Sequence, residues 1–436
     1  MLPVTEEEPT QRYLRLLMWL LVPAAFFNGF DAELRALLLP QLQKAFGVGT
    51  AALGIANIPI GAGQFVAFFF VRLADRLGRR PVLLVSLLGY ALCTGLTASA
   101  SSVFTFALYQ ALGQVCLGTE YALAVLVVAE EMPPERRGRA IGTLLVAAPL
   151  GAVATAALLG AGLQRTELGW RAFYLVGVVP LLAVGLARRL IHETTAFRLA
   201  ERGERSHPRI PFREVLARPT RRLILALGAL NFLEKVPVTA GAGWWVYYAE
   251  KERHLSTGLV AIDLGTAYAL GTLGYYVCGR AIDRFGRRPV AATYLGLGAA
   301  FGIALFQSSG EAANFVLLIL AVFFGLGIGP ALSALSAESF PTRIRAQAGA
   351  VVGNGFANAG ELAGPALVGL LGERHGLIGS IGDSVSVLVV LMPMAMLVLW
   401  RFVPETRGRL LYSETGPPDP ASAGAPDGAG DRGGGP

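Results

Sequence analysis

The sequence predicts an all-α integral membrane protein in which twelve transmembrane helices form two pseudo-symmetric six-helix bundles. Three observations predict this fold: the chain is very apolar, its apolar residues form long segments, and one polar motif occurs twice. Of the 436 residues, 54% are hydrophobic and only 15% are charged. An average soluble domain has about 25% charged residues. We therefore expect most of the apolar surface to face lipid.

Twelve segments have the roughly 20 predominantly apolar residues that a membrane-spanning helix needs. They are 13–39, 51–73, 81–99, 102–129, 140–163, 170–191, 222–248, 258–281, 289–308, 313–337, 347–372 and 380–403. A polar, Arg-rich connection separates the sixth segment from the seventh. The predicted domains are an N-terminus at 1–12, a bundle at 13–191, a loop at 192–221, a bundle at 222–403 and a tail at 404–436, which is mostly disordered by composition.

The basic residues of the loops predict the orientation of the chain. Loops after even-numbered segments hold 23 Arg and Lys residues, whereas loops after odd-numbered segments hold six. Because cytoplasmic loops carry the excess of Lys and Arg, both termini and the 192–221 loop are predicted to be cytoplasmic, in the plasma membrane. The acidic N-terminus lacks a cleavage site after a short apolar core, so the first helix is expected to be an uncleaved anchor.

Composition also argues against several kinds of function. The net charge of +7 comes from short loops between apolar segments, which does not predict nucleic-acid binding. Cys93, Cys116 and Cys278 lie inside apolar segments and are interpreted as core residues. No phosphate-binding glycine loop, metal-ligand spacing or nucleophile–base pair is visible. We expect no enzyme activity, no metal, no cofactor and no obligatory protein partner.

A ten-residue motif occurs at 72–81 as RLADRLGRRP and again at 280–289 as RAIDRFGRRP. Each copy connects two apolar segments, at the same place in each half of the chain. The motif resembles the G-x-x-x-D-R-x-G-R-R loop of the major facilitator superfamily, although Val71 replaces the first glycine of the first copy. The segments AEEMPPERRG at 129–138, AESFPTR at 337–343 and PETRG at 404–408 are similar to those of its sugar-porter and metabolite–proton symporter branch.

This resemblance implies the major facilitator fold, with a solute site between the two bundles near the membrane midplane. It also implies secondary active transport by alternating access. The motif residues are predicted to form a cytoplasmic gate, in which Asp75 and Asp283 face helix N-termini and arginines reach Glu130 and Glu338. The alternative is that the arginines only set the topology. The predicted gate residues are Asp75, Arg76, Gly78, Arg79, Arg80, Glu130, Arg137, Asp283, Arg284, Gly286, Arg287, Arg288, Glu338, Arg343 and Arg345.

Charged residues inside a predicted span are candidates for a functional site, because a charge at the bilayer centre costs about 2.5–3.5 kcal/mol or more. Gly29, Phe30 and Asp31 resemble the G-Y-D of proton-coupled symporters, in which the aspartate carries the proton. The alternative is that Arg35, four residues on, holds Asp31 ionised. Gln110 stands where the family often has an arginine, and Glu120 is expected either in the cavity or in a helix–helix hydrogen bond. The predicted proton-coupling residues are Asp31, Arg35, Gln110 and Glu120.

A further set of residues is predicted to bind the solute. Asn354, Asn358 and Glu361 share one helix face, which must look inward. Glu234 and Lys235 are adjacent, so we expect them to point in different directions without pairing. The aromatic residues near 244–248 are expected either in an interface belt or as a clamp on a substrate ring. The predicted substrate-binding residues are Asn28, Glu234, Lys235, Trp244, Trp245, Tyr248, Asn354, Asn358 and Glu361.

The sequence therefore predicts a secondary active transporter for a small polar organic solute, with proton symport as the expected coupling and the proton gradient as its energy source. Pro237 and Val238 replace the paired glutamines that bind hexose in sugar porters, which argues against a hexose. The family resemblance favours an organic acid or aromatic metabolite. Two alternatives stay open: an exporter or antiporter of organic cations or drug-like solutes, and a non-transporting nutrient sensor. The expected partners are the solute and the lipid bilayer.

Overall fold

The computed structural model describes residues 11–194, 218–341, 344–373 and 377–407, and their regular structure is helical. The N-terminal half contains α1 (Gln11–Leu37), α2 (Leu39–Phe46), α3 (Thr50–Leu77), α4 (Arg79–Ala98), α5 (Val103–Glu131), α6 (Pro134–Gly160), η1 (Leu163–Arg165), α7 (Arg171–Ala187) and η2 (Arg188–Leu190). The C-terminal half contains α10 (Arg218–Tyr247), η3 (Tyr248–Glu252), α11 (Thr257–Gly271), α12 (Leu273–Phe285), α13 (Arg287–Gln307), α14 (Glu311–Gly325), α15 (Gly329–Ser339), α16 (Arg345–Ala350), η4 (Val351–Ala357), α17 (Asn358–Leu371), α18 (Ile381–Val389) and α19 (Leu391–Phe402).

Nine helical segments in the described part of the chain are long and apolar enough to cross a membrane. The other three predicted spans are helical but shorter or interrupted. Helix α7 has only 17 residues, Thr272 separates α11 from α12, and the π-helical η4 separates α16 from α17. Length and hydropathy thus support nine of the twelve predicted spans. The predicted cytoplasmic loop and tail lie largely outside the described residues.

Small residues explain some of the interruptions that the sequence analysis did not predict. Helix α14 ends at Gly325 and α15 begins at Gly329, where Pro330 occupies the first turn. A Cβ on Gly327 would lie 3.0 Å from the Cα of Gly274 on α12, so the two backbones nearly touch. Interrupting the helix permits this close approach, which a side chain at either position would prevent.

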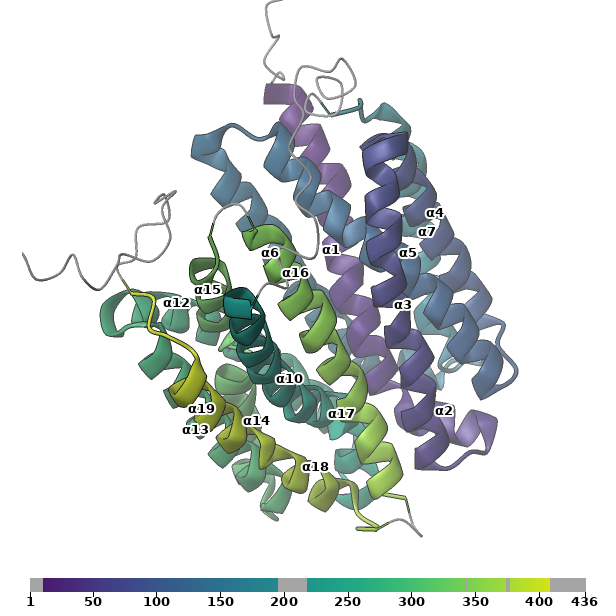
Figure 1. Ribbon diagram of the computed structural model, residues 1–436. Coiled ribbons are helices and arrows are strands. Elements are labelled where there is room, and N and C mark those ends of the chain that lie inside the picture. The colour runs from purple at the N-terminus through teal and green to yellow at the C-terminus, as the bar shows by residue number, and fades with distance from the viewer. Residues whose placement is uncertain (1–10, 195–217, 342–343, 374–376, 408–436) are drawn as a thin grey trace, which may run out of the picture.

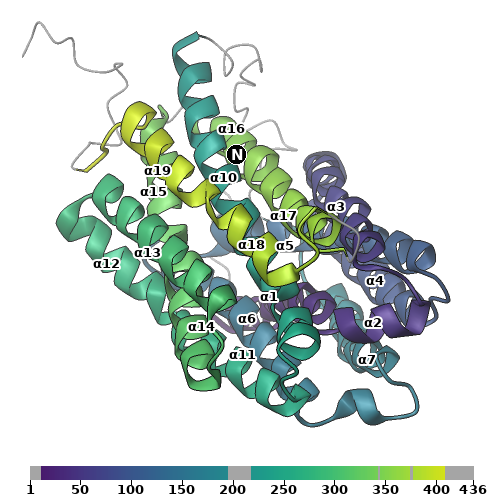
Figure 2. The ribbon, with the colours of Figure 1, turned by 90° about the horizontal axis from the view of Figure 1, so that it is seen from below.

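The two halves of the chain lie side by side (Figures 1 and 2). They contact each other where α3 packs on α17, α6 on α11 and α1 on α10. A Cβ on Gly54 of α3 would lie only 2.9 Å from the Cα of Gly369 on α17. On the other pair, a Cβ on Gly265 would lie 3.7 Å from the Cβ of Ala156. These contacts join the halves toward the end of the bundle that carries α2, opposite the duplicated arginine motif.

Large apolar side chains cover the outer surface of both halves. Trp19, Phe104 and Leu397 are 78%, 75% and 69% exposed, respectively. Such an exterior is stable only in an apolar surrounding, so the helical bundle is that of an integral membrane protein.

Candidate functional site

A cavity of about 290 Å³ lies between the two halves. Helices α1 and α3 contribute its wall on the N-terminal side, and α10, α11 and α17 contribute the wall on the C-terminal side. Its polar and charged lining residues are Glu33, Arg35, Asn57, Gln64, Lys235, Thr239, Tyr268, Asn358 and Glu361. Four residues that the sequence analysis singled out, Arg35, Lys235, Asn358 and Glu361, are therefore brought together.

Asp31 lies directly behind this wall and is only 1% exposed. Its Oδ2 atom is 3.6 Å from Nη1 of Arg35 and accepts a hydrogen bond of 2.8 Å from Nε2 of Gln114. Gln110 also lies beside Asp31, as the sequence analysis expected, and its Nε2 donates to Oγ1 of Thr97 at 3.3 Å. Gln114 lies one helical turn further along α5 and reaches the same carboxylate, because positions four apart share a helix face. The recurrence of Gln at 110 and 114 was the signal that could have identified it.

Glu33 connects the two halves at the cavity. The Tyr268 hydroxyl on α11 donates a hydrogen bond of 2.5 Å to Oε1 of Glu33 on α1. The other carboxylate oxygen of Glu33 is buried without a hydrogen-bond partner. Tyr268 was not singled out from the sequence, because an isolated tyrosine in an apolar segment carries no positional signal.

Lys235 lies between two carboxylates of the C-terminal half. Its Nζ atom is 3.9 Å from Oε2 of Glu234 and 4.0 Å from Oε1 of Glu361. The expectation that Glu234 and Lys235 do not pair is therefore wrong. The long lysine stem lets its ammonium reach back beside the preceding carboxylate even though the two Cβ atoms diverge. Glu234 is 1% exposed and does not line the cavity, whereas Glu361 does.

Glu120 is also away from the cavity. It forms an ion pair with Arg188 and accepts a hydrogen bond of 2.9 Å from the Ser86 hydroxyl. Arg188 is one of the 23 basic residues counted for the loops after even-numbered segments, but it is 1% exposed and also donates to the Leu20 carbonyl at 2.8 Å. A carboxylate buried between helices requires a counter-charge, and the turn η2 supplies it. The alternative of a helix–helix contact for Glu120 is the one that the geometry favours.

The aromatic residues of α10 and η3 are core residues rather than an interface belt. Trp244 is 0% exposed and donates to the Pro365 carbonyl at 2.9 Å, while the Tyr248 hydroxyl donates to the Phe306 carbonyl at 2.8 Å. Neither lines the central cavity. Trp245 instead lines a smaller apolar cavity of about 70 Å³ inside the C-terminal half. A helical period of 3.6 residues could not reveal this, because residues 244–249 are buried on every side.

The remaining predicted residues do not contribute to the described cavity. Asn28 is partly buried and does not line the cavity. The side chains of Asn354, Asp75 and Arg137, and all of Arg343, lie outside the part of the chain that the structure describes.

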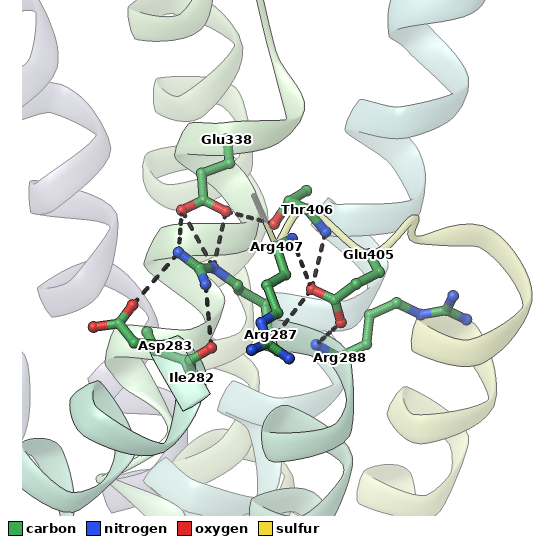
Figure 3. Close-up of polar contacts among 8 residues, drawn as sticks. All are labelled: Ile282, Asp283, Arg287, Arg288, Glu338, Glu405, Thr406 and Arg407. Atoms are coloured by element: carbon green, nitrogen blue, oxygen red, sulfur yellow. Dashed lines mark hydrogen bonds and ion pairs between the residues drawn. The ribbon is translucent and has the colours of Figure 1, made fainter. Parts of the chain in front are cut away.

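The predicted gate forms two similar clusters, and Figure 3 shows the one in the C-terminal half. Arg287 donates to Glu338 at 2.9 and 3.0 Å and to the Ile282 carbonyl at 3.1 Å, and Glu338 also accepts from the Thr406 hydroxyl. In the N-terminal half, Arg79 donates to Glu130 at 3.1 Å. The expected arginine–glutamate contacts are therefore present. Each joins helices of one half, and neither bridges the two halves.

The carboxylates at the helix N-termini differ from those expected. Asp283 has a 76% exposed side chain and lies 3.6 Å from Arg287. Glu193 instead accepts from the backbone N–H groups of Arg79 and Arg80 at 2.7 and 3.2 Å, and Glu405 accepts from those of Arg287 and Arg288, both at 2.9 Å. Glu193–Thr194 and Glu405–Thr406 repeat the same dipeptide, and that repeat was the missed signal.

Hydrogen bonding explains the titration of Glu405. Partial burial favours the protonated form, but backbone N–H donors from Arg287, Arg288, Thr406 and Arg407 outweigh it and lower the pKa of Glu405 below 4.5. The adjoining glycines permit this approach. Gly78 and Gly286 have φ of 97° and 98°, and a Cβ on Gly78 would lie 2.4 Å from Oε2 of Glu193.

The other predicted gate arginines contact backbone carbonyls or are exposed. Arg80 and Arg288 donate to the carbonyls of Arg189 and Trp400, at 2.7 and 2.5 Å. Arg345 donates to the Phe340 carbonyl at 3.3 Å. Arg76 and Arg284 are exposed.

Two helical halves around a charged central cavity are the arrangement of a membrane transporter that carries solutes. The sequence matches the family model described as Major Facilitator Superfamily over residues 21–262 and 238–425. The chain belongs to this superfamily.

Similar proteins are transporters too. A putative metabolite transport protein of Haemophilus influenzae is 26% identical over 88% of this chain and 94% of its own length. A probable 4-methylmuconolactone transporter of Cupriavidus pinatubonensis is 27% identical, with 92% of each chain covered. Among solved structures, a D-xylose–proton symporter has a TM-score of 0.75 at 17% identity, covering 91% of this chain and 99% of that one. This structural likeness shows the fold.

Proposed function

We propose that the protein carries a small organic anion together with protons across the cytoplasmic membrane by alternating access. The observation that supports this most is the position of two cationic side chains. Arg35 on α1 and Lys235 on α10 come from opposite halves, and both line the cavity. A carboxylate bound between them makes ionic contacts with both halves at once, so its binding favours closure around the solute.

The charge balance of the site supports proton coupling. Six ionisable groups lie in or directly behind the cavity: four carboxylates (Asp31, Glu33, Glu234 and Glu361) and two bases (Arg35 and Lys235). With all six ionised the group has an excess of two negative charges, and an anionic solute adds another. Unpaired charge in a low-dielectric interior is costly. Binding of an anion is therefore least unfavourable when carboxylates of the site take up protons at the same time.

The apolar cavity inside the C-terminal half supports a solute with an unsaturated or ring-shaped body. It shares Val238, Ala242, Tyr268 and Leu326 with the central cavity, so the two adjoin. Buried Trp245 lines it, and the indole Nε1 has no hydrogen-bond partner. A solute whose carboxylate lies near Lys235 and whose apolar ring points toward Trp245 has its charge in the polar cavity and its ring in the apolar one.

Three relatives are named for solutes of this chemistry. Besides the 4-methylmuconolactone transporter, they include a cis,cis-muconate transport protein of Acinetobacter baylyi and a gallate transporter of Pseudomonas putida, each 26% identical. Muconate and gallate are unsaturated or aromatic carboxylates. We infer that an acid of this class is the solute here, that both termini are cytoplasmic, and that the proton gradient drives transport without a cofactor.

The test is solute-driven proton movement into proteoliposomes that contain a pH-sensitive dye. Benzoate, acetate, xylose and tetraethylammonium represent aromatic acids, aliphatic acids, sugars and organic cations. We expect benzoate to move protons through the wild type and not through Asp31→Asn. Accumulation of benzoate without a proton signal, equal in both proteins, would contradict symport.

An organic cation is the second candidate, because the ionisable groups of the site include two more acids than bases. A proton signal of opposite sign with tetraethylammonium, and none with benzoate, would favour a cation antiporter over the anion symporter.

A further inference from the structure

The internal duplication gives Asp31 a counterpart in the C-terminal half. Helix α1 holds Asn28 and Asp31 three residues apart, and α10 holds Asn231 and Glu234 at the same spacing. Both helices are the first of their half, and they contact each other between the halves. Each carboxylate is 1% exposed and lies beside a base that lines the cavity, Arg35 for Asp31 and Lys235 for Glu234.

The surroundings of Glu234 differ from those of Asp31 in one respect. Asp31 accepts a hydrogen bond from Gln114, whereas neither oxygen of Glu234 has a hydrogen-bond donor. The titratable groups that act on Glu234 are Lys235 on its own helix, Glu361 on α17 and Tyr275 on α12. Lys235 is the one cation among them, so the charge of Glu234 depends on it.

Lys235 does not form a hydrogen bond with Glu234. Its ammonium lies 3.9 Å from Glu234 and 4.0 Å from Glu361, too far for a hydrogen bond to either. Glu361 has a side chain that is 38% exposed and faces the cavity, so water solvates its charge when Lys235 turns away. Glu234 has no such solvation.

We propose that Glu234 is a second proton-binding site, which takes up a proton when a solute carboxylate replaces it as the partner of Lys235. This rests on the anionic solute proposed above. The exchange balances in charge: one anion enters, one proton binds to a carboxylate oxygen of Glu234, and the ammonium of Lys235 stays charged. Without that proton, the buried carboxylate would lose its counter-charge, which is strongly unfavourable in a low-dielectric interior. Release of the anion returns Lys235 to Glu234 and expels the proton.

The experiment measures protons taken up per anion bound. Purified full-length protein in weakly buffered detergent solution is titrated with benzoate, while a pH indicator follows protons and calorimetry follows binding. We expect Glu234→Gln to bind benzoate with one proton fewer than the wild type, and Glu234→Asp, which remains ionisable, to retain the uptake. Asp263→Asn is the matched control, because Asp263 is a buried carboxylate of the same half that does not line the cavity.

Two results would overturn the inference. One is a Glu234→Gln protein that binds benzoate with the full uptake of the wild type. The other is an equal reduction in Glu234→Gln and Asp263→Asn, which would indicate a general effect of removing a buried acid. Failure of the proposed function has a different signature, since the wild type would then bind benzoate without any proton uptake, or not at all.

Discussion

Arg188 and Glu120 are buried opposite charges at the packing centre of the N-terminal half, 1% and 0% exposed. Ser86 and the Leu20 carbonyl complete their hydrogen bonds. At the scale of single residues this pair is structural, because it joins η2 to α1, α4 and α5 without reaching the cavity. The charges around Lys235 are arranged differently. The ammonium lies 3.9 Å from Glu234 and 4.0 Å from Glu361, and both Lys235 and Glu361 line the cavity, where a solute can reach them.

Replacement of Arg188 by Met is expected to destabilise the protein. It leaves Glu120 as a buried charge without its counter-ion, which costs about 3–5 kcal/mol. The midpoint of thermal unfolding in detergent should fall clearly, and Glu120→Gln in the same chain should restore part of the loss. Arg189→Met is the control, because Arg189 is exposed. Equal midpoints for Arg188→Met and Arg189→Met would show that the pair contributes nothing.

At the scale of helices, carboxylates from distant segments cap helix N-termini. Glu193 caps α4, and Glu405 caps α13. The acid comes from beyond the last membrane helix of α1–α7, or of α10–α19, so each contact connects the end of a half to α4 or α13. Glycines with positive φ make room for the two carboxylates.

Substitution of Glu405 by Gln should reduce stability in a pH-dependent way. The pKa of Glu405 is lower in the folded protein than the usual 4.5, so its contribution is present above 4.5 and is lost as the pH falls through the lowered value. We expect the unfolding midpoints of wild type and variant to differ at neutral pH and to converge in acid. A difference that does not change with pH would contradict this assignment.

The contact between α3 and α17 depends on two glycines. A Cβ on Gly54 would meet the Cα of Gly369 at 2.9 Å, a backbone atom that cannot turn away. Overpacking of this kind costs about 1–3 kcal/mol, so Gly54→Ala should reduce the population with these helices in contact by roughly 5- to 150-fold. Transport should fall accordingly while the protein stays folded. Gly258→Ala, where a Cβ would meet nothing within 4 Å, should transport normally.

At the scale of the whole molecule, the two halves are joined toward the α2 end, and the cavity lies between them. Alternating access requires these contacts to part during each cycle. The parting of these contacts can be tested at Gly265 and Ala156. A Cβ on Gly265 would be 3.7 Å from that of Ala156, which is within the range for a disulfide.

The double variant Ala156→Cys and Gly265→Cys should form a cross-link between α6 and α11. The background would lack Cys93, Cys116 and Cys278. Oxidation should abolish solute transport into proteoliposomes and reduction should restore it, while either single cysteine should have no effect. Undiminished transport by the fully cross-linked protein would show that the halves do not separate at this interface.

The sequence by itself determined the class of the protein, because apolar segment length, loop charge and a duplicated motif are local properties that lipid and helix geometry impose. It also singled out Arg35, Lys235 and Glu361, which line the cavity, and Asp31 behind them, since charges in apolar segments stand out. It did not find Gln114 and Tyr268, could not choose between the two alternatives for Glu120, and did not predict that the aromatic residues near 244–248 are buried in the core. The partners of these side chains lie on helices distant in sequence, or on a face that periodicity cannot distinguish.

Only the tertiary structure decided which charges meet. It paired Glu120 with Arg188, placed Glu33 against Tyr268 across the halves, and put Lys235 between Glu234 and Glu361. The physical reason is that a buried charge is stabilised by whatever group lies within a few ångströms. That distance depends on helix packing, which no segment of the sequence specifies alone.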